Sequence, residues 1–513
     1  MRDRRGGKRE KPRDTKGTLL RALRYVSNYS VPLIIVLVLC LISNLLSLKG
    51  PDFAGEAIAA ADAGAGKVDF DKIYYYAGCM LAVYVSSSIL TLSIHFIMMN
   101  ISRHIAKQMR SDVFHKLMKL PVKYFDRHAA GDIMSRVSYD IDVVSTCIST
   151  DIVHIMTSVV TIVGSFFMML AIAPPLMVVL LVTIPLTVMY TRGMAKKTRP
   201  RYSKRSAAYG KLNGFVEEMF SGQKTILAYA QEDTMMERFD VINEEACDAF
   251  YQAECLGKSI GPTVGMFNNL GLALTGMFGS ILYLYQVISL KQFSTFVLRC
   301  NKFSRPINEI SNVTNEIFSA LAAAERVFRL LDEEEELHDI LNAYELKDVR
   351  GDVDLKDVSF GYLPEKRIIH DFDIQAEAGK MIAIVGPTGA GKTTIINLLM
   401  RFYDPDEGEI FVDGHEIRSV TRKSLRRSYA MVLQDTWLFN GTIFDNIAYG
   451  KEGATMEEVI AVAKAARIHH TIMQLPQGYN TIIGEDGGNI SKGQKQLLTI
   501  ARAMLYNAKM LIL

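Results

Sequence analysis

The stretch MIAIVGPTGAGKTTIINLLMRF occupies residues 381–402 and places a glycine-rich loop between two apolar runs. Residues 386–393 match the pattern G-x-x-x-x-G-K-[ST], with Lys392 and Thr393 in its last two positions. In such a loop, backbone N–H groups surround phosphate oxygens, the lysine reaches the outer phosphates, and the hydroxyl binds Mg²⁺. The apolar run before the loop predicts a strand at 381–385, and the run after it predicts a helix. Together these features predict an α/β domain that binds a nucleotide.

Working outward, the N-terminal part of the chain is much more apolar. Hydrophobic residues make up 49% of the 513 residues and are concentrated before residue 330. A bilayer core requires about 20 mostly apolar helical residues. Stretches without Asp, Glu, Lys or Arg lie at 25–48, 73–102, 152–191 and 259–290. Because Pro174 and Pro175 interrupt the third stretch, it predicts two helices joined by a tight turn, and so five spans in all.

A sixth span is expected at 289–311, although Arg299, Lys302 and Arg305 interrupt its apolar pattern. The basic leader at 1–24 and the nucleotide-binding domain are both expected on the cytoplasmic side, which requires an even number of spans. The charges of the sixth span are then expected to face the bundle interior or an aqueous cavity. A long amphipathic cytosolic helix is the alternative for this segment.

Two long basic segments, 103–136 and 192–258, are expected to carry the helices far into the cytoplasm. The segment 50–72 is rich in Gly, Ala and Asp and is expected to be an outward loop. Helix breaks are expected at Pro121 and Gly131 in the first segment and around Ser221 and Gly222 in the second. Helix–turn–helix segments of this kind suit contact with a cytoplasmic partner surface, and plain solvated hairpins are the alternative.

The predicted domains follow from these patterns. They are a cytoplasmic leader (1–24), a transmembrane domain (25–331), an acidic linker (332–350) and a nucleotide-binding domain (351–513). The net charge of +3 does not indicate a nucleic-acid partner. The six cysteines lack the paired spacing of a zinc site, so neither a metal centre nor a disulfide framework is expected.

The sequence resembles the ABC transporter superfamily, and within it the exporters whose transmembrane domain precedes the nucleotide-binding domain. The resemblance rests on the phosphate loop together with Tyr362 in VSFGY, Gln434 in AMVLQDTWLF and the segment NISKGQ at 489–494. It implies that Tyr362 stacks on adenine and that Gln434 contacts Mg²⁺ and senses the membrane domain. The fold implied is a six-helix transmembrane domain followed by a RecA-like α/β domain.

The resemblance also assigns the individual site residues. Those expected to bind ATP are Tyr362, Gly386, Pro387, Thr388, Gly389, Ala390, Gly391, Lys392, Thr393, Thr394 and Gln434, with Mg²⁺ at Thr393 and Gln434. The signature residues expected at the ATP of the opposite subunit are Ser491, Lys492, Gly493 and Gln494. The usual Leu-Ser-Gly-Gly-Gln is altered at Ile490 and Lys492. The alteration favours a non-identical partner chain, with an identical pair as the alternative.

Two further expectations come from the resemblance. Residues 219–226 are expected to lie in a groove of the opposite nucleotide domain, and residues 124–131 to form a second coupling contact. The apolar run 509–513 is similar to the strand that ends in the Walker B aspartate and the catalytic glutamate, which are expected to follow Leu513. No catalytic acid is therefore assigned, and the chain as given is expected to bind ATP weakly without hydrolysing it.

The function implied is ATP-driven export across the plasma membrane, performed by half of a dimeric transporter. Drug-like amphiphiles, lipids and peptides are all possible cargo. A membrane-anchored signalling ATPase and an ABC-type gated channel are the alternatives from other functional classes.

Overall fold

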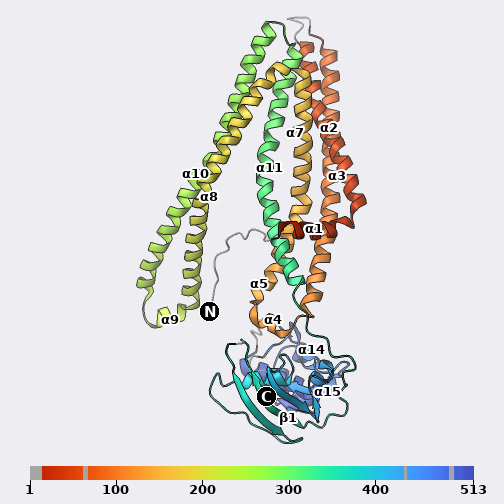
Figure 1. The fold of residues 1–513 in the computed structure, drawn as a ribbon, viewed down its shortest axis with the longest axis vertical. Helices are drawn as coiled ribbons and strands as arrows, with labels where there is room; N and C mark the ends of the chain where they lie inside the picture. The colour runs from red at the N-terminus through yellow and green to blue at the C-terminus, as the bar shows by residue number, and fades with distance from the viewer. Residues whose placement is uncertain (1–13, 62–67, 364, 433–435, 485–489) are drawn as a thin grey trace. The chain divides into compact units, whose positions relative to one another are not determined.

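The computed structural model describes residues 14–61, 68–363, 365–432, 436–484 and 490–513. The chain forms two compact units (Figure 1). The first unit comprises Met1–Met118 and Gly131–Glu333, and the second comprises Lys119–Ala130 and Glu334–Leu513. The first unit is helical in its described part, whereas the second combines short strands with helices.

The described part of the first unit consists of long helices and several short ones. They are α1 (Thr15–Ser27), α2 (Ser30–Ala61), α3 (Phe70–Leu117), α5 (Ala130–Ser135), α6 (Ile141–Thr146), α7 (Ile152–Ile172), α8 (Met177–Ser221), α9 (Gln223–Ala228), α10 (Glu232–Leu284) and α11 (Leu290–Leu331). The π-helical turns Arg136–Asp140 and Cys147–Asp151 join α5, α6 and α7 into one continuous helix. In the described residues, 5 helices are long and apolar enough to cross a membrane.

The predicted helix break at the proline pair is confirmed, and the predicted loop before α3 is wrong. Pro174–Leu176 form a 3-10 turn between α7 and α8. By contrast, α2 continues through Pro51 to Ala61 and α3 begins at Phe70, so most of 50–72 is helical. Within this part of α2, Gly55 allows close packing against α11, because Oγ1 of Thr295 lies 2.0 Å from where a Cβ would stand. Residues 62–67 lie outside the described part.

The helix α11 contains the segment expected as the sixth span. It starts with a capping box between Ser289 and Gln292, and it packs against α2, α7 and α10. The Arg299 side chain is only 1% exposed, and its Nη2 lies 2.7 Å from Oδ1 of Asp52 on α2. Lys302 donates a hydrogen bond of 2.7 Å to the carbonyl oxygen of Ser47. These cations thus lie inside the helical bundle, where charged groups of a membrane span are expected.

Replacing Arg299 by methionine should destabilise the first unit. The change leaves the Asp52 carboxylate, which is 34% exposed, without its partner, so the expected cost lies at the lower end of the roughly 3–5 kcal/mol for breaking a buried ion pair. Thermal unfolding of purified protein in detergent should show a large decrease in the midpoint temperature. Lys211→Met is the matched control because it breaks the exposed pair of Lys211 with Glu245, which contributes about 0–1 kcal/mol. Equal effects of the two substitutions would contradict this account of α11.

Two helices of the first unit extend far beyond a bilayer. α8 and α10 run side by side and are joined by α9 at one end (Figure 1). With 53 residues, α10 is about 80 Å long, compared with roughly 30 Å of hydrocarbon in a membrane. The predicted break at Gly222 is confirmed, because α8 ends at Ser221 and α9 begins at Gln223. The tip formed by α9 therefore lies in an aqueous compartment.

The second unit contains three small sheets. Its strands are β1 (Val353–Phe360), β2 (Ile369–Ala376), β3 (Glu407–Val412), β4 (His415–Glu416), β5 (Tyr429–Met431), β6 (Gly441–Thr442), β7 (Ile482–Ile483) and β8 (Met510–Ile512). The largest sheet is antiparallel with the order β2-β1-β3-β4, and β5 pairs with β8 in parallel. The helices are α4 (Val122–Arg127), α12 (Lys392–Leu399), α13 (Arg422–Arg427), α14 (Ile443–Ala448), α15 (Met456–Ala465), α16 (His469–Met473) and α17 (Lys492–Tyr506).

Two large hydrophobic cores stabilise the described part of this unit, and a small third cluster of Ala430, Val432 and Ala503 joins β5 to α17. Ile395 and Leu398 of α12 are buried against the β1, β2 and β3 strands. Leu498 and Ala501 of α17 belong to a second core, which is formed with α14, α15 and α16. The phosphate loop and the signature segment are consequently anchored in different cores of the same unit.

Candidate nucleotide-binding site

The phosphate loop leads directly into α12. Gly391 is the residue before the helix and has φ = 91°, a left-handed conformation that favours glycine. A Cβ at this position would come within 2.5 Å of Cδ1 of Ile369, so packing also excludes a side chain. Gly389 has φ = 88°. These conformations let the loop turn tightly and present its N–H groups at the N-terminus of α12.

Lys392 bends back over the loop. Its Nζ donates hydrogen bonds to the carbonyl oxygens of Gly386, at 2.7 Å, and Pro387, at 2.9 Å. The ammonium group is therefore held above the loop by backbone atoms, in the region where phosphate oxygens would enter. Thr393, in the first turn of α12, is exposed and available to a metal ion, whereas Thr394 is buried.

The strand predicted at 381–385 is not formed. This segment pairs with no strand in the described part of the chain, and its apolar side chains are exposed, with Met381 at 94% and Val385 at 87%. A strand requires hydrogen-bonding partners on a neighbouring segment, and an apolar run by itself does not supply them. The strand β8 in the run 509–513 does form, because β5 lies parallel to it.

Tyr362 lies beside the phosphate-loop helix. Its hydroxyl accepts a hydrogen bond of 2.9 Å from Nδ2 of Asn397 on α12. Its ring makes edge contacts with the rings of Phe360 and Tyr403, at centroid distances of 5.1 and 5.0 Å. The aromatic side chain is thus fixed in position relative to the helix that carries Lys392. An adenine ring could stack on a tyrosine that is held in this way.

A further contact joins Tyr403 to the short helix α4. The Tyr403 hydroxyl donates a hydrogen bond of 2.6 Å to Oδ2 of Asp126. Burial raises the pKa of this hydroxyl, and the hydrogen bond to the Asp126 carboxylate raises it further, so it remains a donor at neutral pH. The sequence carries no signal for this pairing, because the two residues are 277 positions apart and belong to no common motif. They connect the expected coupling segment 124–131 to Tyr362.

The signature segment lies at the start of α17. Ser491 is the N-cap, and it forms a capping box with Gln494 through backbone-to-side-chain bonds of 2.9 and 3.3 Å. Lys492 and Gly493 are exposed, and no atom lies within 4 Å of where a Gly493 Cβ would stand. The segment therefore presents a hydroxyl, a cation and an open backbone at the N-terminus of a helix, a combination suited to an anion.

The structure does not bring all predicted site residues together. Tyr362 and the loop lie at the core that contains α12, whereas the signature residues lie on the helical core of α17. Gln434 lies outside the described residues. The described groups that can hold a nucleotide triphosphate are therefore the loop N–H groups, Lys392, Thr393 and Tyr362.

Family comparisons assign both parts of the chain. Residues 33–307 match the family described as the ABC transporter transmembrane region, and residues 369–513 match the family described as ABC transporter. The two matches correspond to the helical unit and to the part of the second unit that carries the phosphate loop.

Similar proteins agree with this assignment. An uncharacterised ABC transporter ATP-binding protein of Bacillus subtilis is 38% identical over 99% of this chain and 83% of its own length. A fatty acid ABC transporter ATP-binding/permease protein of Mycobacterium bovis is 37% identical over 92% of this chain and 72% of its own. An ATP-dependent lipid A-core flippase of Syntrophus aciditrophicus is 31% identical over 80% of this chain and 69% of its own length.

One solved structure resembles the whole arrangement. It is a bacterial Atm1-family ABC exporter with ATP bound, with a TM-score of 0.73 and 26% sequence identity. The similarity covers 94% of this chain and 84% of the exporter chain. With two matching families in one polypeptide and relatives of this identity, the chain belongs to the ABC transporter family, as an exporter-type protein in which a transmembrane region is fused to an ATP-binding domain.

Proposed function

We propose that this chain is half of a dimeric exporter that uses ATP to move an amphiphile across the plasma membrane. The observation that carries the proposal is the position of Lys392, which is held over a glycine loop at the N-terminus of α12. A positive charge and free N–H groups at one helix end form a site for the outer phosphates of ATP, with Thr393 and Gln434 as the Mg²⁺ contacts.

The separate cores of the second unit support a dimer. Lys392 and Ser491 are both expected at phosphate groups, yet they are anchored in different cores. A second nucleotide domain, related by a two-fold or pseudo-two-fold axis, supplies the missing signature segment to each ATP. The altered signature at Lys492 favours a non-identical partner, and a pair of identical chains is the alternative.

The tip of the α8 and α10 pair supports the same assembly. Phe220, Leu227 and Tyr229 are large hydrophobic side chains that are 57–75% exposed around α9. Exposed apolar side chains clustered at one end of an element indicate a contact with another protein. We assign residues 219–226 to a groove of the partner's nucleotide domain, and α4 to the second coupling contact.

The proposed substrate class is an amphiphile. The chain carries at least 5 helices that can cross a membrane, and the relatives above are named for fatty acid transport and for flipping lipid A-core. A substrate with an apolar tail and a polar head suits a translocation path along such helices. Peptide cargo has no comparable support among these relatives.

An uptake experiment tests the proposal. Inside-out vesicles prepared from native membranes should accumulate a fluorescent single-chain lipid when ATP and Mg²⁺ are supplied. They should not accumulate it with ATP and a chelator, because Mg²⁺ neutralises the phosphates during phosphoryl transfer. Lipid movement that equilibrates without ATP would instead indicate a channel, and ATP hydrolysis without lipid movement would favour a signalling ATPase.

The proposed topology gives a second test. A reporter inserted after Ala61 should be accessible from outside the cell, whereas reporters at the N-terminus and at Glu336 should both be protected. This result follows from six spans, with α11 as the sixth, because an even number returns the chain to the cytoplasm. Impermeant cysteine labelling of intact and of opened cells measures the difference. Labelling of Glu336 in intact cells would require an odd number of spans.

A further inference from the structure

Two neighbouring hollows line one side of α8. The first has a volume of about 520 Å³ and is lined by Pro185, Val188, Met189, Arg192, Gly193 and Lys196. The second, of about 140 Å³, is lined by Phe166, Met169, Met177, Leu180, Leu181, Ile184, Pro185 and Phe303. Pro185 belongs to both, so the hollows adjoin. The larger one has the size typical of small-ligand sites, which is roughly 300–1,000 Å³.

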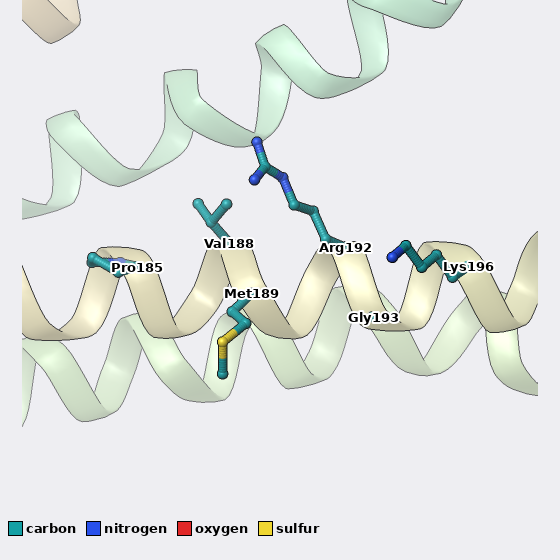
Figure 2. Close-up of a pocket in the computed structure, with 6 residues that line it drawn as sticks. All are labelled: Pro185, Val188, Met189, Arg192, Gly193 and Lys196. Carbon is teal, nitrogen blue, oxygen red and sulfur yellow. The ribbon is translucent and has the colours of Figure 1, made fainter.

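The two hollows together form a track along α8 from Met177 to Lys196. Its two ends differ in chemistry. The α8 residues from 177 to 184 that line the smaller hollow are all apolar, and the deep end is closed by the buried side chains of Met169 and Phe303. At the other end, Arg192 and Lys196 follow Val188 at four-residue spacing, which places them on neighbouring positions of one helix side. Val188 and Arg192 project away from the helix, and Lys196 lies along its surface (Figure 2). From 177 to 196 the track is about 28 Å long at 1.5 Å per residue.

The two cations of the track have no acidic partner among the residues that the structure describes. Further along α8, Arg205 and Lys211 form ion pairs with glutamates of α10. Arg192 and Lys196 form no ion pair with a described carboxylate, and both side chains are exposed at the hollow. Their positive charges are thus available to an anion that lies in the larger hollow.

We propose that this track binds a single-chain anionic amphiphile, with its carboxylate or phosphate head between Arg192 and Lys196 and its alkyl chain along the apolar side of α8. This inference rests on the proposed function and narrows its substrate class from amphiphiles in general to anionic ones. The alkyl chain contributes about 0.8 kcal/mol per buried methylene, and the head gains charge-assisted contacts at the edge of the apolar region. A cationic drug-like amphiphile would meet two like charges at the same position.

Direct binding of hexadecanoate tests the site. The purified protein is placed in phosphatidylcholine nanodiscs without nucleotide, and radiolabelled hexadecanoate is titrated, with empty nanodiscs as the blank. The double variant Arg192→Gln/Lys196→Gln should weaken binding about tenfold or more, the effect of losing charged hydrogen-bond contacts. Lys197→Gln/Arg199→Gln removes two exposed cations that do not line the track, and it should leave the affinity within about twofold of wild type.

Ligand variants test the two ends separately. Methyl hexadecanoate, which lacks the charge, should bind weakly and equally to all forms of the protein. Octanoate should bind at least about 100-fold more weakly than hexadecanoate, because a shorter chain buries fewer methylenes. Equal affinity of the acid and its ester, or equal weakening by both double variants, would overturn the proposal. The titration is repeated with the protein in phosphatidylglycerol nanodiscs. Complete loss of hexadecanoate binding there would also overturn the proposal, since an anionic bilayer lipid would then occupy the site.

The same preparation separates this inference from the motor assignment. Because the titration contains no nucleotide, an unaltered affinity in Arg192→Gln/Lys196→Gln rejects the anion site alone. ATP binding measured on the same nanodiscs reports on the phosphate loop and should be equal in wild type and both double variants. If the proposed function fails, the ATP-binding measurement will show it, because Lys392→Ala will then bind ATP as tightly as wild type.

Discussion

In the protein as it occurs in its native membrane, Lys392→Ala is expected to lower ATP-driven transport by about 100-fold or more while leaving the protein correctly inserted in the membrane. The lysine supplies the point charge at the outer phosphates, and removing one such electrostatic contact typically costs 10²–10³ in rate. Its Nζ donates hydrogen bonds to the loop carbonyls of Gly386 and Pro387, and Lys392 is not part of the hydrophobic core around α12, so its removal should leave that core intact. The loss is therefore one of function and not of folding.

The measurement needs a matched lysine as control. Lys380 lies in the same domain, and its exposed side chain pairs only with exposed Glu377. Lys380→Ala should retain ATP-dependent lipid uptake and photolabelling by an azido-ATP analogue, and Lys392→Ala should lose both. Unchanged uptake in Lys392→Ala vesicles would remove the motor assignment.

Local sequence signals predicted the features that depend on local chemistry. The breaks at Pro174 and Gly222 follow from backbone conformations that interrupt a helix, and the phosphate loop follows from glycines and a lysine within eight positions. The apolar stretches also predicted the 5 described helices that are long and apolar enough to cross a membrane, since each helix satisfies its own backbone hydrogen bonds.

Features that depend on distant partners were not predictable in this way. The run 381–385 has the composition of a strand but no described neighbour with which to pair. The pairing of Arg299 with Asp52 joins positions that are 247 apart, and the bond from Tyr403 to Asp126 joins positions 277 apart. A single sequence contains no signal for such pairs, whereas its periodicity does indicate which helices exist.

The second large effect concerns Ser491, at the start of α17. Ser491→Arg in both copies of an identical pair should abolish ATP hydrolysis, because a long cationic side chain would occupy the exposed helix end that we propose meets the phosphates of the partner's nucleotide. The same change also removes a helix cap, which costs about 1 kcal/mol. The experiment must separate the two effects.

Thr455 offers the matched control for the lost cap. It begins α15 with the same kind of capping box, formed with Glu458, and α15 packs into the same core as α17. Thr455→Arg should therefore lower stability by about the same amount, roughly 1 kcal/mol, and leave hydrolysis intact. Equal losses of hydrolysis in the two variants would assign the effect to folding.

The identity of the second chain is tested by purification from the native membrane. A non-identical partner should co-purify with this chain, and Ser491→Arg in this chain alone should then inactivate only one of the two sites. Recovery of a fully active pair of identical chains would reject the unequal pair and keep the shared sites. Full activity in a lone monomer would reject the shared sites themselves.

Two differently tagged copies of the chain give the sharpest test of sharing. If each ATP lies between Lys392 of one chain and Ser491 of the other, Lys392→Ala and Ser491→Arg on the same copy inactivate both sites. The same two changes on opposite copies fall together in one site and leave the other complete, so about half of the hydrolysis should remain if the sites act independently. Sites built within single chains would give the reverse result, with activity surviving only when both changes are on one copy.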